Sequence, residues 1–288
     1  MKQYRICIQK RSNHKLKSDS ILPNVLTAAF LKSTLWDYND VIKVYMFPLE
    51  KDFTPKFTSI DELSRNGTCV CDPLEYEIRN LSPQEAVKLV VEKRIVPLVG
   101  LKIIFVDKPE DSNVRVKFKD DGAWAYVGTE NRDNTDYASE TVNFGWIDAS
   151  TIMHEFGHVL GLIHEHQSSL GNHIKWDDEA VYKWASETQG WSRELTYENV
   201  IRPYRKSLLN GSDFDPKSIM LYFFPAELTK DKVGTKQNNI LSKLDYEWFQ
   251  KNYPMNVDPS ITRNNPNYLS KMIAFILVCI VIYIILDV

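Results

Sequence analysis

Residues 154–165 read HEFGHVLGLIHE, and this stretch decides the fold and the chemistry that we expect of the chain. On a helix, His154 and His158 lie one turn apart on the same face, so one tetrahedral Zn²⁺ can accept both imidazoles. Gly161 tolerates a positive φ and can end the helix, which lets His164 turn back as a third ligand. Three protein ligands and an open fourth position are typical of a catalytic zinc site and argue against a purely structural one.

Glu155 follows the first of these ligands, where it can take a proton from water without binding the metal itself. The pattern H-E-x-x-H alone is a weak signal, because it also occurs by chance in surface helices. The added Gly161 and His164 make it far more specific in a chain with only six histidines, four of which fall between residues 154 and 166. The residues therefore predict hydrolysis at a zinc site, with Glu155 as general base.

The longer motif resembles that of the metzincin zinc endopeptidases, and Glu165 after the third histidine resembles the astacin branch. Downstream, residues 218–222 (SIMLY) resemble the Met-turn of this family, in which a methionine packs beneath the metal. The resemblance implies that Tyr222 reaches the zinc or the oxyanion, and a phenol there can donate a hydrogen bond to a tetrahedral intermediate. It also implies one catalytic Zn²⁺ on the three histidines and a protein or peptide substrate.

Further short segments resemble bacterial and fungal astacin-like peptidases, and the likeness runs from about residue 101 to residue 254. These segments are 113–116, 124–128, 143–146, 174–177, 190–194, 225–229 and 241–245. The family likeness implies an α+β metzincin-like fold, a twisted mixed sheet packed on two long helices with the zinc site in a cleft. A substrate peptide would then add to the sheet edge along residues 124–127.

The sequence departs from the family pattern in three places. Leu221 stands where the family usually has His, one residue before the Tyr of the Met-turn. The sequence has no F-x-G-D segment of the kind that supplies the Asp of an astacin pro-region. In secreted members Glu165 meets the matured N-terminus, so here we expect it to form a local salt bridge instead. The disulfides of secreted members cannot form from the four cysteines present, which are Cys7, Cys69, Cys71 and Cys279.

Leu221 supports an alternative function for the same residues. A zinc-binding pseudopeptidase would hold extended peptides without cutting them and act as a membrane-anchored adaptor. The ligand and catalytic residues are all present, which favours the enzyme. Zinc content and turnover, measured together, separate the two functions.

Composition divides the chain into four parts. We expect a basic N-terminal segment at 1–34, a catalytic domain at 35–255, a polar linker at 256–271 and a transmembrane tail anchor at 272–286. The last part is an unbroken apolar run. As a helix it reaches only about 22 Å against a hydrocarbon core of roughly 30 Å, so spanning needs flanking residues such as a snorkelling Lys271. Because the run is rich in Ile and Val, a buried strand is the alternative.

Charge and flanking residues bear on the partners and the compartment. The net charge of -3 gives no global attraction to nucleic acid, so we expect no nucleic-acid partner. No signal-peptide pattern follows Met1, although residues 1–18 lack acids and leave a transit peptide as a weaker alternative. Arg263 and Lys271 precede the apolar run, which favours a single-pass C-terminal anchor with the catalytic domain on the cytosolic side. This architecture is similar to zinc metalloproteinases encoded by large DNA viruses such as iridoviruses, in which case the membrane is that of the host cell or virion.

Local patterns predict the elements that surround the motif. Alternation predicts strands over 35–47, 101–106, 114–118 and 124–127. Ser82 is expected to cap a helix that begins at Pro83 and closes at Pro97, and Ser242 with Asp245 to cap the last helix. Residues 51–80 look like an insertion or a long hairpin.

Overall fold

The computed structural model describes residues 8–10, 30–66, 71–170, 174–204, 206–210 and 214–255. Within them, a mixed sheet takes the strand order β1-β7-β8-β6-β3-β5. Strand β7 is antiparallel to β8, and the remaining pairs are parallel. The strands are β1 (Ile8–Lys10), β3 (Val41–Met46), β5 (Lys102–Phe105), β6 (Val114–Lys117), β7 (Ala123–Tyr126) and β8 (Val142–Phe144).

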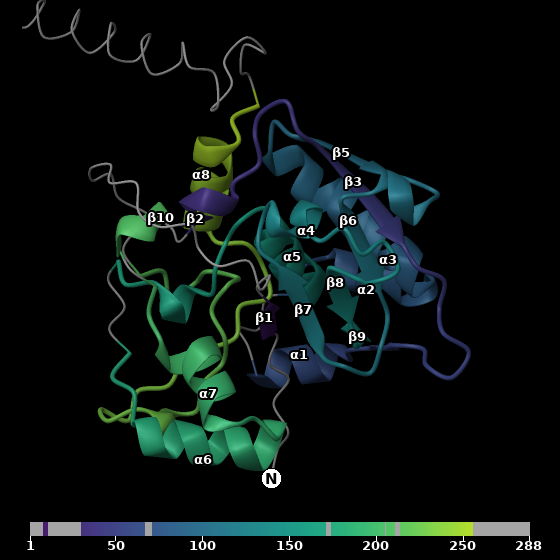
Figure 1. Ribbon diagram of the computed structural model, residues 1–288. Coiled ribbons are helices and arrows are strands. Elements are labelled where there is room, and N and C mark those ends of the chain that lie inside the picture. Colours follow the sequence, from purple (N-terminus) through teal and green to yellow (C-terminus); the bar gives the residue numbers. More distant parts are fainter. Residues whose placement is uncertain are drawn as a thin grey trace, which may run out of the picture.

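Two short ladders and a set of helices complete the described fold. Strand β2 (Phe30–Leu31) pairs antiparallel with β10 (Leu209–Asn210), and β4 (Lys56–Phe57) pairs parallel with β9 (Trp146–Ile147). Figure 1 shows α6 and α7 gathered on one side of the molecule and the large sheet on the other. The α-helices are α1 (Ile60–Asn66), α2 (Leu74–Glu77), α3 (Pro83–Val90), α4 (Glu130–Asp133), α5 (Ala149–Val159), α6 (Asp178–Gln189), α7 (Arg193–Thr196) and α8 (Lys243–Asn252).

Helices α3 and α5 pack against each other, and α5 also packs against β7. The predicted start of α3 is confirmed, because the Ser82 side chain accepts from the Glu85 amide and the Glu85 carboxylate accepts from the Ser82 amide. The helix continues as a π turn and a 3-10 turn to Leu98, close to its predicted end. Its apolar face and that of α5 are buried with the sheet strands in one core. The described residues therefore have the predicted α+β architecture.

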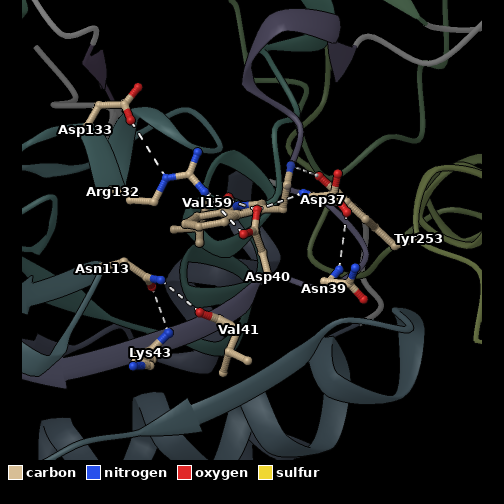
Figure 2. Close-up of polar contacts among 11 residues, drawn as sticks. Asp37, Asn39, Asp40, Val41, Lys43, Asn113, Arg132, Asp133, Val159 and Tyr253 are labelled. Atoms are coloured by element: carbon tan, nitrogen blue, oxygen red, sulfur yellow. Dashed lines mark hydrogen bonds and ion pairs between the residues drawn. The ribbon is translucent and has the colours of Figure 1, made fainter. Parts of the chain in front are cut away.

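The C-terminal end of α5 is held by side chains from segments far before and far after it in the sequence. The last carbonyls of a helix have no donor within the helix, so they need donors from elsewhere. The Trp36 indole Nε1 donates to the Val159 carbonyl at 2.7 Å, and the Tyr253 hydroxyl donates to the Leu160 carbonyl at 2.7 Å. Figure 2 shows Val159 and Tyr253 in this region. Both aromatic side chains are fully buried, so the end of α5 is fixed inside the core.

Gly128 makes a third contact with this end of α5, and only glycine fits there. Its amide donates to the His158 carbonyl at 2.8 Å, and its φ is +54°. A Cβ at this position would lie 1.8 Å from the Thr34 carbonyl oxygen. A side chain would therefore collide with the backbone at Thr34.

We expect Gly128→Ala to lower the free energy of unfolding by about 3 kcal/mol or more, because it combines left-handed strain with a backbone clash. Gly122→Ala is the matched control, since Gly122 has a φ of +71° but a Cβ there would meet no atom of the described residues within 4 Å. The control should cost only about 1–2 kcal/mol. Denaturant unfolding of both variants measures the difference, and equal losses would show that the contact with Thr34 carries no weight.

Two sequence expectations differ from the structure in detail. The strand expected over 35–47 forms only at β3, because the backbone turns at Asp37–Asp40, where the Asp40 amide donates to the Asp37 carbonyl at 2.9 Å. Residues 51–80 form no hairpin in their described part. There β4 pairs with the distant β9, and the Ser59 side chain caps α1 by accepting from the Glu62 amide at 3.1 Å.

The ends of the chain were expected to lie outside the catalytic domain. Phe30 and Leu31 are fully buried, and the Leu31 amide donates to the Gly161 carbonyl at 3.1 Å, so this part of the 1–34 segment packs on the domain. The four-part division itself stays a prediction. The linker at 256–271 and the tail at 272–286 lie outside the described residues. Within the described ranges no helix has the length and apolar character needed to cross a bilayer.

Candidate zinc site

The three predicted ligands come together at the end of α5. His154 and His158 lie on the helix, and the chain turns at Gly161, whose φ is +100°, to bring His164 back toward them. One ligand atom from each ring lies within 4.8 Å of the others. The Nε2 atoms of His158 and His164 are 3.0 Å apart. All three rings are buried, so the geometry fits the shared three-histidine site that the sequence predicts.

The ring orientations fit a divalent metal. His154 Nδ1 lies 2.8 Å from the Ile219 carbonyl and His158 Nδ1 lies 2.7 Å from the Leu162 carbonyl. A carbonyl only accepts, so each Nδ1 carries the proton and each Nε2 presents a lone pair to the centre. Within the described ranges, His154 Nε2 is buried without a hydrogen-bond partner. Facing lone pairs are unfavourable unless a cation lies between them, which makes Zn²⁺ a suitable occupant for these donors.

Burial keeps the three imidazoles neutral. It lowers the pKa of His154 to about 4, and burial together with the neighbouring histidines lowers the pKa of His158 and of His164 well below the ordinary value. A histidine binds metal through an unprotonated nitrogen. The site is therefore ready to bind a metal at neutral pH without first losing protons.

Met220 packs against α5 at Gly157, which lies between the two helical ligands. It is buried, and a Cβ on Gly157 would lie 2.7 Å from the Met220 sulfur, so the glycine in the helix lets the methionine approach closely. Asp245, at the start of α8, holds the turn from below. Its carboxylate accepts from the Ile219 amide at 2.9 Å and from the Ser218 hydroxyl at 2.8 Å. The Met-turn inferred from residues 218–222 is thus present as a packed, hydrogen-bonded turn.

Tyr222 is in contact with the ligands. Its ring stacks on His154 with centroids 5.4 Å apart and planes 21° apart, and its hydroxyl is hydrogen-bonded to His164 Nε2. Glu155 lies on α5 between the two helical ligands, and its side chain is fully buried. The three ligands and Tyr222 therefore lie around one centre, and Glu155 follows the first ligand on the same helix. The catalytic roles of Glu155 and Tyr222 remain predictions.

Glu165 contacts the backbone. Its Oε1 accepts from the Asp215 amide at 2.7 Å, while its own amide donates to the Met220 carbonyl at 3.1 Å. Burial raises the pKa of this carboxyl to about 8. The expected local salt bridge is absent from the part of the chain that the structure describes, where Glu165 instead links the zinc-site loop to the Met-turn.

Sequence reasoning missed His166, although it belongs to the cluster of four histidines. Its ring stacks on His164 with centroids 5.3 Å apart and planes 15° apart. Its Nε2 lies 3.0 Å from the Asn199 carbonyl, which fixes the ring in place. His166 therefore packs against the third ligand and helps to position it. Its spacing of two residues from His164 is the sequence signal that could have identified it.

Sequence reasoning also missed Glu75, which caps the zinc-bearing helix from another segment. Asp148 is the N-cap of α5 and accepts from the Thr151 amide at 2.7 Å. Glu75 of α2 accepts from the Ala149 amide at 2.7 Å and is fully buried. Two carboxyls thus serve the unpaired amides of one helix start. An Asp before a helix is a recognisable cap, but nothing local to Glu75 indicates a contact with residue 149.

The burial of Glu75 near Asp148 predicts that the stability of the fold depends on pH. Burial, and after it the charge of Asp148, raise the pKa of Glu75 to about 8. The hydrogen bonds from the Ala149 and Ser150 amides and the charge of Arg79 act in the opposite direction. Cys71 is the other titratable group near Glu75. The unfolded carboxyl ionises near 4.5. Between these values the folded state binds the extra proton, so stability falls as pH rises from about 4.5 to about 8.

We expect Glu75→Gln to remove this part of the pH dependence, because the amide keeps an acceptor for Ala149 and does not ionise. Relative to wild type, the free energy of unfolding of the variant should rise by on the order of a few kcal/mol between pH 5 and pH 8. Urea unfolding at several pH values measures it. Parallel curves for the two proteins would contradict the prediction, and Glu77→Gln, on the same helix, is the control.

The outer edge of β7 is paired with this chain's own β1. Ile8 lies opposite Trp124, Gln9 opposite Ala125 and Lys10 opposite Tyr126, all in the parallel sense. A substrate peptide was expected to add along this same edge. In the structure a substrate can pair there only in place of β1.

The site has the arrangement that metzincin peptidases share, as the sequence motif implied. It consists of a helix with two histidines, a glycine turn to the third histidine and a buried methionine in the following turn. A family model described as Astacin, a peptidase family, matches residues 101–254. The match covers more than half of the chain, and the chain belongs to the astacin family of zinc-dependent endopeptidases. The range inferred from short segments is confirmed.

Three solved structures are similar to this chain. One structure of myroilysin is 27% identical with a TM-score of 0.64, covering 80% of this chain and all 100% of that chain. A crystal structure of myroilysin is 24% identical with a TM-score of 0.50, covering 86% and 90%. The high choriolytic enzyme 1 of the medaka fish Oryzias latipes, a hatching enzyme and zinc-protease, is 13% identical with a TM-score of 0.41, covering 79% and 97%. The comparison with curated proteins gives no match.

Proposed function

We propose that this chain cuts internal peptide bonds of protein or peptide substrates. The observation that carries the proposal is the meeting of three neutral imidazoles, two of them oriented by backbone carbonyls, with Tyr222 in contact and Glu155 on the same helix. A pocket opens at the same place and has His154 and Tyr222 in its lining, so a substrate side chain can reach the centre. Membership of a peptidase family supports the same function.

Each residue of the centre has a distinct part in the proposed mechanism. His154, His158 and His164 would hold a zinc ion, which would supply Lewis-acid polarisation of the scissile carbonyl and a lowered pKa for water. Glu155 takes a proton from the attacking water and delivers it to the leaving amine. Tyr222 donates its hydroxyl proton in a hydrogen bond to the oxyanion.

The hydroxyl of Tyr222 is the group that the mechanism needs. We expect Tyr222→Phe to lower kcat by about 100-fold, as loss of one oxyanion donor does in other enzymes. Zinc content and KM should change little, because the ring can still stack on His154. Steady-state kinetics with metal analysis on the same sample makes the measurement, and an unchanged kcat would remove Tyr222 from the mechanism.

The test of the function itself is cleavage of a mixed peptide library by the full chain with and without a chelator. Cleavage that the chelator stops and added zinc restores supports the proposal. A zinc-loaded protein that binds peptides but cuts none points to the adaptor function suggested by Leu221. In the structure Leu221 lines the pocket at the centre, so it bears on peptide binding.

We also propose that residues 272–286 anchor the enzyme in a membrane, with the catalytic domain on the cytosolic side. The support is the apolar run itself and the basic residues before it. Alkaline extraction of membranes from cells that express the full chain or a chain ending at residue 268 tests this. Equal extraction of both proteins would argue for the buried-strand alternative.

A further inference from the structure

The pocket beside the histidines has an acidic group at one wall. Glu62 lines it from α1, a segment that precedes the family-matched range, and Asp148 lines it from the start of α5. No Lys or Arg is among the lining residues in the described part of the chain. Glu62 is half-buried, whereas its neighbour Asp61 is exposed and does not line the pocket.

The two carboxylates differ in how far solvent and substrate can reach them. Asp148 is buried, and it accepts from the Thr58 hydroxyl at 2.8 Å, from the Ser150 hydroxyl at 2.6 Å and from the Thr151 amide at 2.7 Å. Because these donors occupy its oxygens, Asp148 adds negative charge to the pocket but is poorly placed to contact a substrate directly. Glu62 is only half-buried, so it is the carboxylate that an incoming cation can approach.

The other walls combine uncharged polar side chains, among them Thr58, Gln237 and Asn238, with an apolar surface. Leu63, Trp146, Ile219, Leu221 and Phe223 all line the pocket. Lys and Arg side chains have an aliphatic stem that packs on apolar surface and a charged head that needs an anion or water. The apolar part of this wall, with a carboxylate beside it, suits such a side chain and disfavours an acidic one.

Position relative to the reacting centre ties the pocket to a substrate. His154 lies in the lining together with Tyr222, and its buried Nε2 has no hydrogen-bond partner among the residues that the structure describes. A side chain in this pocket would therefore belong to a residue next to the scissile bond.

We propose that this pocket selects Lys or Arg beside the bond that is cut and that Glu62 is the residue that determines this specificity. The inference rests on the proposed peptidase function. Positive charge behind the pocket comes from Arg79, whose guanidinium donates to the Thr58 carbonyl at 2.8 Å and is not among the lining residues.

The experiment uses the zinc-loaded full chain and a peptide series in which each residue flanking the cleaved bond is Lys, Arg, Leu or Glu in turn. At one flanking position we expect kcat/KM for Lys or Arg to exceed that for Glu by at least about tenfold. Glu62→Gln should reduce the ratio about fivefold, as expected for a half-buried ion pair, and Glu62→Lys should reverse it. Asp61→Asn is the matched control on the same helix and should leave the ratio unchanged.

Salt gives a second readout that needs no variant, because the preference should shrink at high ionic strength. A wild-type enzyme with no basic preference, or Glu62 variants with the wild-type ratio, would overturn the inference. Binding of the same peptides to zinc-loaded Glu155→Gln protein separates this result from failure of the proposed function. A basic preference in binding with no turnover by wild type would uphold the pocket and overturn the peptidase.

Discussion

Glu155→Gln should lower kcat by a factor of about 10²–10⁴ and leave zinc bound. Glutamine has nearly the shape of glutamate, so it fits the same fully buried position, but it cannot accept the proton of the attacking water. The three ligand histidines are untouched by this change. Loss of rate with retained metal is therefore the result that a general base predicts.

Stopped assays with a fluorogenic peptide, together with metal analysis of the same sample, make the comparison. Glu165→Gln is a suitable control, because that carboxyl accepts from the Asp215 amide and has no part in the proposed mechanism. Near-normal cleavage by the Glu155→Gln protein would refute the mechanism. A variant without zinc would show instead that the residue acts in holding the metal.

His158→Ala should remove zinc from the protein and, with it, all activity. His158 is the central ligand, since its Nε2 lies 3.0 Å from that of His164 and its ring centroid lies 4.9 Å from that of His154. Two ligands bind zinc much more weakly than three, and ligands held by the folded chain link binding to stability. We expect one bound zinc in wild type and none in the variant after dialysis.

Thermal unfolding distinguishes this effect from simple damage to the core. A chelator should lower the Tm of wild type and leave the Tm of the His158→Ala variant unchanged, because only wild type has a metal to lose. A chelator effect of the same size on both proteins would mean that zinc stabilises the fold from some other site.

The parts of the site that sequence predicted correctly are those with local signals. These signals act over a few residues, so the sequence shows them directly. They are the helical spacing of His154 and His158, the glycine that ends the helix, and the Ser82 and Ser242 caps. The Met-turn followed from a family likeness, and its burial and hydrogen bonds confirm it.

Long-range contacts account for what sequence could not provide. Glu75 meets the start of α5 across a separation of 74 residues, and Trp36 meets its end across 123. The pairing of β1 with β7 likewise joins segments that lie far apart along the chain. Such contacts are decided by how elements pack together, and no periodicity or cap near either partner encodes them.

The way α5 is held at both ends has a consequence for dissecting the protein. Trp36 and Glu75 lie before the family-matched range of 101–254, yet each hydrogen-bonds to the helix that carries two ligands. A fragment cut to the matched range would leave helix-end groups and apolar surface without their partners. The range that identifies the family is thus smaller than the unit that folds, and a fragment meant to fold should begin ahead of β2.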